Sequence, residues 1–236
     1  THQTTTHMKI LTSANAKLLK SRDRGYISYG IHLAPHNVSG HNVCSHASPG
    51  CSASCLNTSG HGAFNSVQQA RIRKTLWMIH DRAVFLEQLW KEIHTVAKSA
   101  LRGGMQPCFR LNLTSDLPWE SIKRAGESPM QAFSDFWFYD YTKIPRRMGS
   151  KLPENYRLTF SRSETNESAA QRVLAAGGNV AMVFAGKTLP KKYLGYRVVN
   201  GDEDDLRFLD PSPVIVGLSA KGKAKHDTSG FVIHTT

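Results

Sequence analysis

Apolar and polar positions follow two different rhythms along this chain. Short runs rich in β-branched and aromatic residues, bounded by glycine, proline or polar residues, predict strands. The predicted strands cover residues 26–34, 108–116, 136–143, 156–164, 179–186, 196–199, 214–222 and 231–235. Elsewhere apolar residues recur at every third or fourth position, which predicts helices.

The predicted helices begin at Ser66 and cover 82–102 and 168–176. The clearest is 82–102, where Phe85 and Leu89 belong to one apolar face and Gly103 follows the last turn. Glycine commonly ends a helix because it adopts the left-handed conformation without strain.

Strands that alternate with helices predict an α/β fold with a mostly parallel sheet. The sheet is expected to be open, or to form a complete or partial (β/α) barrel. We find no internal repeat and no boundary that would divide the chain. Residues 8–236 are therefore expected to form a single domain, with a cysteine loop at 41–62 near its start.

Residues 1–7, THQTTTH, resemble the remnant of a purification tag and are excluded from the predicted fold. The stretch after Met8 lacks the apolar core and cleavage site of a signal peptide. No run of eighteen apolar residues is present, so no membrane span is predicted. A cytoplasmic protein is expected, in which clustered cysteines bind metal more often than they form disulfides.

The cysteine loop carries three of the four cysteines, spaced Cys44-x6-Cys51-x3-Cys55. One helical turn between Cys51 and Cys55 would point both sulfur atoms the same way. Cys108 opens a different predicted strand, which places it at the opposite rim of a parallel sheet, and we interpret it as a buried structural cysteine.

Three thiolates without a fourth predict a [4Fe–4S] cluster with one open iron, and a [3Fe–4S] cluster fits the same ligands. The alternative is a closed zinc site, with one histidine as fourth ligand. The candidate histidines are His41, His46 and His61.

Polar residues follow several predicted strands, at the edge where ligands bind in parallel sheets. The candidates for binding a cofactor are Ser115, Asp116, Lys143, Ser161 and Ser163. Structural roles fit them as well: Asp116 would cap a helix near Pro118, Lys143 would be a surface lysine, and the serines, with Glu164, would cap the next helix.

The net charge of +12 favours a polyanionic partner such as nucleic acid, although charge alone also serves solubility. The positive charge lies in short loops at 143–151, 187–192 and 221–225, and is opposed by one acidic run at 202–205. Lys221 and Lys223 suit either phosphate contact or an exposed turn. The sequence shows no nucleophile–base pair and no P-loop, which argues against a hydrolase or a kinase.

Several blocks of the sequence resemble the bacteriophage gene product 88 family. They are NVCSHASPGCSASCL, GHGAFNSVQQARIRKT, RLNLTSDLPWE, FYDYTK, LTFSRSE and VIVGLSAKGKAKHDTSGFV, and they fall within about residues 13–232. The resemblance implies a phage protein in the cytoplasm of an infected host cell.

The organisation is also similar to a reduced radical S-adenosylmethionine (SAM) enzyme. This resemblance implies a barrel of the TIM type, a [4Fe–4S] cluster and SAM as a ligand. Radical SAM enzymes usually space their cysteines x3 then x2, and Thr114-Ser115-Asp116 stands where they have a glycine-rich motif.

Two functions are therefore expected. The first is an iron–sulfur protein with an open iron that binds a small molecule, with radical-SAM-like activity as its enzymatic form. The second is a non-enzymatic module, stabilised by its metal, that binds nucleic acid or a host protein.

Overall fold

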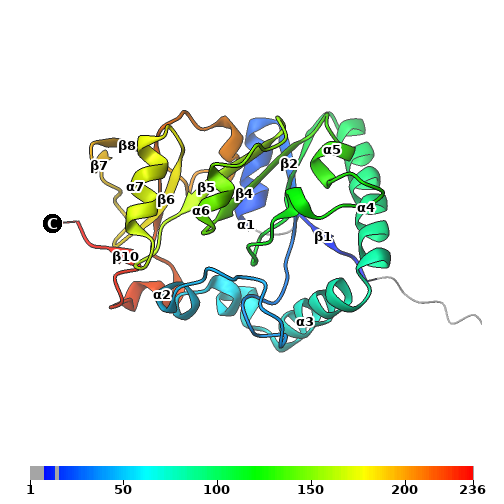
Figure 1. Cartoon of the computed structure of the whole chain (residues 1–236), viewed down its shortest axis with the longest axis horizontal. Coiled ribbons are helices and arrows are strands. Elements are labelled where there is room, and N and C mark those ends of the chain that lie inside the picture. Colours follow the sequence, from blue (N-terminus) through cyan, green and yellow to red (C-terminus); the bar gives the residue numbers. More distant parts are fainter. Residues whose placement is uncertain (1–7, 14–15, 236) are drawn as a thin grey trace, which may run out of the picture.

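In the computed structural model, which describes residues 8–13 and 16–235, ten strands form one mostly parallel sheet (Figure 1). The strands are β1 Leu11–Thr12, β2 Tyr26–Ile31, β3 Gln106–Arg110, β4 Trp137–Thr142, β5 Tyr156–Ser161, β6 Val180–Phe184, β7 Lys192–Tyr193, β8 Tyr196–Asn200, β9 Ile215–Ser219 and β10 Val232–Ile233. The α-helices are α1 Ala16–Leu19, α2 Pro49–Ala53, α3 Asn65–His80, α4 Arg82–Arg102, α5 Pro129–Ala132, α6 Pro145–Met148 and α7 Glu167–Ala175.

The strand order is β1-β2-β3-β4-β5-β6-β9-β8-β7. From β2 to β8 in this order neighbouring strands are parallel, and the outer pairs β1–β2 and β7–β8 are antiparallel. Because β1 and β7 stand at opposite ends of the order, the sheet is open rather than a complete barrel. The α/β class and the mostly parallel sheet are confirmed.

The last strand completes the middle of the sheet. β5 pairs with the first residues of β6, and β10 pairs in parallel with Val183 and Phe184 at its carboxyl end. The C-terminal segment therefore returns to the carboxyl edge of the sheet, where the cysteine segment (residues 41–62) also lies.

The predicted elements are present with shifted ends. α4 has the predicted bounds, whereas the strand predicted at 108–116 covers only Gln106–Arg110. The chain leaves the sheet after Arg110 because its next residues bond elsewhere. Leu113 N donates to Ile31 O at 3.1 Å, and Asp116 N donates to Val43 O at 2.8 Å in the cysteine segment.

α4 and α7 cover one face of the sheet, and their apolar sides form its main core. Phe85 and Leu89 of α4 pack with Phe109 of β3 and Phe138 of β4. α7 packs in the same way over β5 and β6 in a second cluster, around Phe160. The period-3.6 pattern thus marks the sides of α4 and α7 that the sheet buries.

The other face of the sheet is covered by the irregular segment 201–210. Leu206 from this segment packs with Cys108 and Tyr139, and Phe208 stacks on Trp137. Cys108 is fully buried, with its sulfur 3.0 Å from Ser28 Oγ. The predicted burial of Cys108 is confirmed, although Cys108 is the third residue of β3 and does not open the strand at the rim of the sheet.

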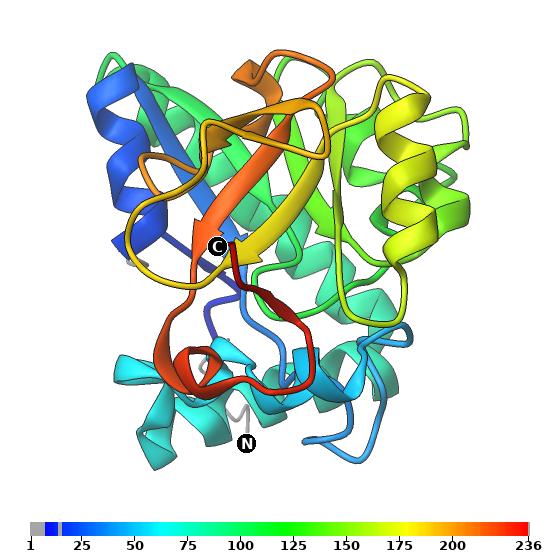
Figure 2. The same ribbon diagram turned by 90° about the vertical axis from the view of Figure 1, so that its left-hand side faces the viewer.

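The parallel strands direct their carboxyl ends toward one edge, where the cysteine segment and the C-terminal segment lie (Figure 2). Figure 1 shows α2 and α3 running beneath this edge. None of the helices in the described part of the chain is both long and apolar enough to cross a membrane. Residues 1–7, interpreted as a tag remnant, lie outside the described residues.

Candidate metal centre at the carboxyl edge of the sheet

Cys44 is placed by contacts between the cysteine segment and the loop after β3. Its backbone N–H donates to Asn42 Oδ1 at 2.8 Å, and the neighbouring Val43 O accepts from Asp116 N. As a result the Cys44 sulfur lies 3.8 Å from Thr114 O. Cys44 thus stands beside Ser115 and Asp116, two of the residues predicted to bind a cofactor.

Cys51 lies on the short helix α2. Ser48 caps this helix, because its Oγ accepts from Cys51 N at 3.1 Å, and Pro49 occupies the first turn. The helix ends at Ala53, and Cys55 follows in extended backbone with φ −61° and ψ 127°. The predicted helical turn therefore includes Cys51 but stops before Cys55.

Glu164, at the end of β5, anchors α2. It accepts hydrogen bonds from Ser48 Oγ at 2.8 Å and from Gly50 N at 2.7 Å. The helix cap considered for Ser161, Ser163 and Glu164 is wrong, because α7 has Asn166 at its N-cap and no side-chain capping bond. Glu164 instead stabilises the first turn of α2, where a negative charge is favoured.

The C-terminal segment closes over the same helix. Cys51 packs against Ala220, Ala224 and Phe231. A Cβ on Gly50 would lie 2.2 Å from Ser229 Oγ and 2.8 Å from Phe231 Cβ. The position thus admits only glycine at this spacing, and α2 is held between β5 and the C-terminal segment.

The three thiols lie within electrostatic range of one another. The pKa of Cys44 is raised to about 11, mainly by burial and also by the negative charges of Asp116, Cys55 and Cys51, while a hydrogen bond with the His36 backbone lowers it. Burial also raises the pKa of Cys55, which Cys51 raises as well. A hydrogen bond with the Asn57 backbone and the charges of Arg71 and Lys143 act in the opposite direction.

Among the described residues, no group of three or more His, Cys, Asp or Glu is placed so that it could hold a metal ion. The histidines considered as zinc ligands make other contacts. His41 packs edge-on against His80, His46 Nδ1 lies 2.9 Å from Ser45 Oγ, and His61 stacks on Phe64. The three thiols are related by the charge effects on the pKa of Cys44 and Cys55, and not by an assembled group of metal ligands.

The structure brings Asp116, Lys143 and Ser161 together. Lys143 N donates to Asp116 Oδ2 at 2.7 Å, and its Nζ donates to Ser161 Oγ at 2.6 Å. The helix cap predicted for Asp116 is wrong, because the 3-10 helix Trp119–Ser121 has no side-chain cap. The other Asp116 oxygen pairs with Arg147 at 2.8 Å instead.

The two remaining candidates point into the protein. Ser115 Oγ donates to Asn112 Oδ1 at 2.8 Å, so it supports the loop after β3. Ser163 is fully buried, and its Oγ lies 3.4 Å from Thr165 Oγ1. Their role in cofactor binding stays a prediction.

Sequence reasoning missed a buried polar network behind this edge. Arg147 binds both oxygens of Glu120 at 2.8 Å and donates to Tyr156 Oη at 2.9 Å. Tyr156 in turn donates to Asp140 Oδ2 at 3.0 Å. Arg147 belongs to the basic loop 143–151, but it is only 3% exposed, and its charge is paired inside the protein rather than presented on the surface. A single sequence gives no signal that separates it from its exposed neighbour Arg146.

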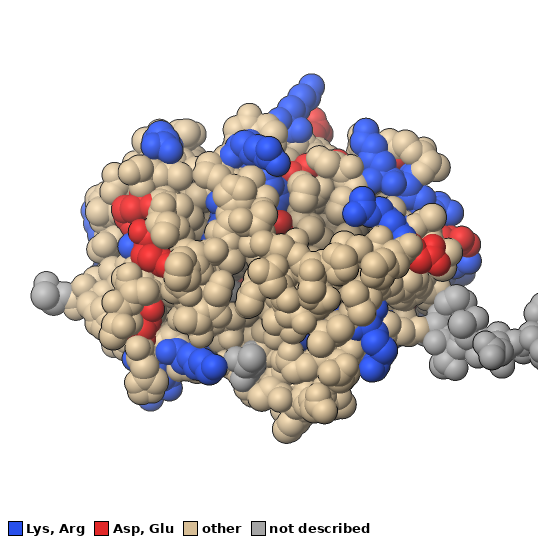
Figure 3. Space-filling view, turned by 60° about the horizontal axis from the view of Figure 1, so that its bottom comes forward, with Lys and Arg blue, Asp and Glu red and all other residues tan. Residues whose placement is uncertain are grey.

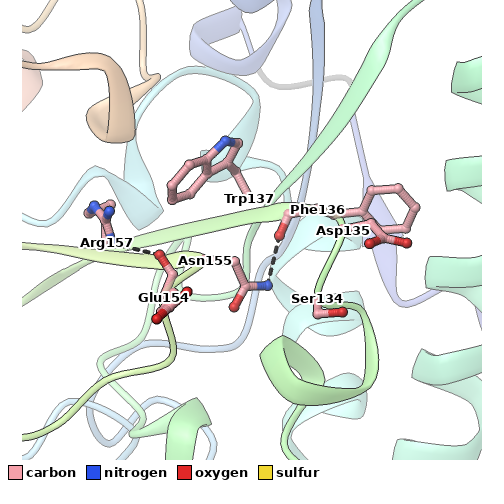
Figure 4. Close-up of a pocket in the computed structure, with 7 residues that line it drawn as sticks. All are labelled: Ser134, Asp135, Phe136, Trp137, Glu154, Asn155 and Arg157. Atoms are coloured by element: carbon pink, nitrogen blue, oxygen red, sulfur yellow. Dashed lines mark hydrogen bonds between the residues drawn. The ribbon is translucent and has the colours of Figure 1, made fainter.

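A hollow of about 590 Å³ lies at the opposite, amino-terminal edge of the sheet (Figure 4). Its lining includes Trp137 and Arg157, and Arg157 stacks over the Trp137 ring at 4.9 Å from its centroid. Phe208 covers the ring as well, stacked at 5.3 Å. The ring is therefore already packed by protein groups, and no cysteine lines this hollow.

The family model for gene product 88 matches residues 9–235. The chain belongs to this family. In this gene product 88 protein, the match spans the cysteine segment, every strand of the sheet and the C-terminal segment. No curated protein and no solved structure matches the chain.

Proposed function

We propose that the protein binds a [4Fe–4S] cluster through Cys44, Cys51 and Cys55, with one iron left open at the carboxyl edge of the sheet. The observation that carries this proposal is that one segment supplies three thiols whose charges act on one another, each positioned by a different contact. Cys44 is placed by the loop after β3, Cys51 by α2, and Cys55 beside Arg71 and Lys143.

The donor set supports iron–sulfur ligation over zinc. All three donors are sulfur, and the fourth cysteine, Cys108, is buried against Ser28 in the sheet. Hydrogen bonds from the backbone of His36 and Asn57 to two of the sulfurs are also typical of iron–sulfur sites, where they adjust the reduction potential.

The enzymatic form of this proposal is radical-SAM-like chemistry in a partial barrel. The open iron would take SAM or a substrate, and reductive cleavage of SAM would supply a radical. Ser115, Asp116, Lys143, Ser161 and Ser163 would orient the ligand. Support for this form comes from the parallel strands and from Lys143 and Ser161, which meet at the edge that holds the cysteines.

Iron and acid-labile sulfide analysis after anaerobic reconstitution tests cluster binding. We expect about four irons per chain and an electron paramagnetic resonance signal after reduction. Replacing Cys44, Cys51 or Cys55 by alanine should abolish loading, whereas Cys108→Ala, the matched control, should retain it. Zinc in place of iron, or equal loss in the control, would contradict the proposal.

A change in the spectrum of the loaded protein on addition of SAM tests the enzymatic form. We expect the signal of the reduced cluster to shift when SAM occupies the open iron. If the spectrum of the fully loaded cluster does not change when SAM is added, the enzymatic form of the proposal is contradicted, whereas the iron–sulfur site is not.

The alternative is a module stabilised by its metal that binds nucleic acid or a host protein in the cytoplasm of the infected cell. The net charge of +12 favours it, as do the exposed Lys223 and Lys225 beside the cysteine segment. On the side where α2 and α3 lie, however, Lys and Arg gather toward the margins of a mostly uncharged centre (Figure 3). This alternative predicts nucleic-acid affinity that falls steeply with salt and unfolding when the metal is removed.

A further inference from the structure

Arg71 of α3 is a buried cation next to the cysteine segment. Its side chain is 9% exposed, and Nη1 donates to Asn57 O at 3.1 Å and also to Asn57 Oδ1. Its Nε has no hydrogen-bond partner among the described residues. Burial lowers the pKa of Arg71, and the one opposing influence is the negative charge of Cys55.

A buried charge is costly unless an opposite charge compensates it. Other buried arginines of this protein have carboxylates at close range: Arg110 with Asp205 at 2.8 Å, Arg147 with Glu120 at 2.8 Å and Arg207 with Asp204 at 3.1 Å. Within the described part of the chain, Arg71 has no such carboxylate. The negative charge that acts on Arg71 is that of the Cys55 thiolate.

The surroundings of Arg71 keep it in this place. Gln68 Nε2 donates to Asn57 O at 2.7 Å, and Asn57 Nδ2 donates to Gln68 Oε1 at 2.9 Å, so the segment around Asn57 is fastened to α3. A Cβ on Gly62 would lie 3.3 Å from Arg71 Nη1. Asn57 also hydrogen-bonds the Cys55 sulfur through its backbone, so it connects the arginine to the thiol.

Lys143, which follows β4, is a second cation whose charge reaches Cys55. Its Nζ donates to Ser161 Oγ and lies 5.6 Å from the centroid of the Phe231 ring. Its charge acts on Cys55 together with that of Arg71. Two cations from separate elements, α3 and the end of β4, thus act on the charge of one cysteine.

We infer that Arg71, assisted by Lys143, is the counter-cation of the metal–thiolate centre and raises its reduction potential. The inference rests on the iron–sulfur site proposed above. One-electron reduction, with dithionite as the electron donor, adds a negative charge to the centre without forming or breaking a bond. A fixed positive charge nearby stabilises the reduced form more than the oxidised form. Arg71 is therefore a positioning and tuning residue rather than a ligand.

A redox titration of the reconstituted protein tests this role. Arg71→Met should lower the midpoint potential by an amount equal to about a tenfold loss of reduced over oxidised centre, or about 59 mV for one electron. Arg73→Met is the matched control, because it removes the same charge from an exposed position on α3. Arg71→Lys should restore most of the potential because it keeps the charge.

Lys143→Met is a second variant that leaves α3 intact, and it should lower the potential in the same direction by a smaller amount. If the loaded Arg71→Met and Lys143→Met variants keep the wild-type potential, the inference is overturned, whereas the proposed iron–sulfur site still stands. An equal shift in Arg73→Met would overturn it too, since the effect would then reflect net charge. Failure of the wild-type protein to bind iron would overturn both the inference and the proposed function.

Discussion

Asp140 is a buried carboxylic acid whose environment is not indicated by its place in the sequence. It lies at the carboxyl half of β4, is fully buried, and accepts hydrogen bonds from Asn112 N, Asn112 Nδ2 and Tyr156 Oη. Burial raises its pKa to about 7, although these bonds and the charges of Arg110 and Arg147 oppose the rise. Desolvation of the carboxylate is therefore the larger effect.

The raised pKa of Asp140 predicts a specific pH dependence of stability. The unfolded chain loses this proton near pH 3.9, whereas the folded protein keeps it up to about pH 7. The contribution of Asp140 is thus fully present below pH 3.9 and is lost as pH rises through 7. Asp140→Asn removes the titration, so the free energy of unfolding of wild type minus that of the variant should fall between pH 4 and 7. Urea unfolding at several pH values measures this, and a difference that grows with pH would contradict the raised pKa.

Helix α2 is too short to be stable alone and depends on the elements around it. Glu164 holds its first turn, and Ser229 and Phe231 of the C-terminal segment press against Gly50. Tertiary contacts, rather than helix propensity, therefore place Cys51. The same contacts make the position of α2 sensitive to the size of residue 50.

Gly50→Ala should separate α2 from the C-terminal segment. The added methyl group meets atoms closer than 3 Å, and overpacking of this kind costs about 1–3 kcal/mol of unfolding free energy. Gly149→Ala is the control, because its Cβ would meet nothing within 4 Å. Chemical denaturation gives both values, and iron loading of Gly50→Ala should fall with stability. If the two variants had equal free energies of unfolding, α2 would be able to shift away from the C-terminal segment without cost, which would contradict tight packing at residue 50.

At the scale of the whole molecule, the segment 201–210 joins strands that are far apart in the sheet. It leaves β8, near one end of the strand order, and crosses to β3 near the other end, where Asp205 pairs with Arg110 at 2.8 Å. Asp204 adds a contact to Arg24 at 3.1 Å, next to β2. The acidic run at 202–205 thus serves internal pairing as well as balancing surface charge.

Asp205→Asn should destabilise the protein strongly because it leaves the buried Arg110 charge without its partner. Asp205 is fully buried, and breaking such a pair costs about 3–5 kcal/mol. The control is Glu87→Gln, which breaks an exposed pair with Lys91 on α4 and should cost less than about 1 kcal/mol. Thermal unfolding of both variants measures the difference. Similar values for the two would mean that segment 201–210 does not hold the sheet edges together.

The fold could be predicted from local pattern to a large extent. Helix α4 has its predicted bounds, since a long amphipathic stretch followed by glycine leaves little ambiguity. The strand predicted at 108–116 ended early because Leu113 and Asp116 form backbone bonds with Ile31 and Val43. Apolar character continues past that point, so periodicity alone could not locate the end.

The candidate site, like the fold, could be predicted from the sequence only in part. The cysteine spacing and the polar strand ends were visible in the sequence, because a parallel sheet brings carboxyl ends to one edge wherever its strands alternate with helices. The partners of Glu164 and Arg71 could not be predicted from the sequence. Each contact joins residues that only the folded chain brings together, and sequence separation does not reveal it. The sequence by itself thus determined the α/β class, the edge that carries the cysteines and the burial of Cys108. Only the tertiary structure decided which charges are neutralised inside and which cations face Cys55, because burial and pairing depend on neighbours that the whole fold supplies.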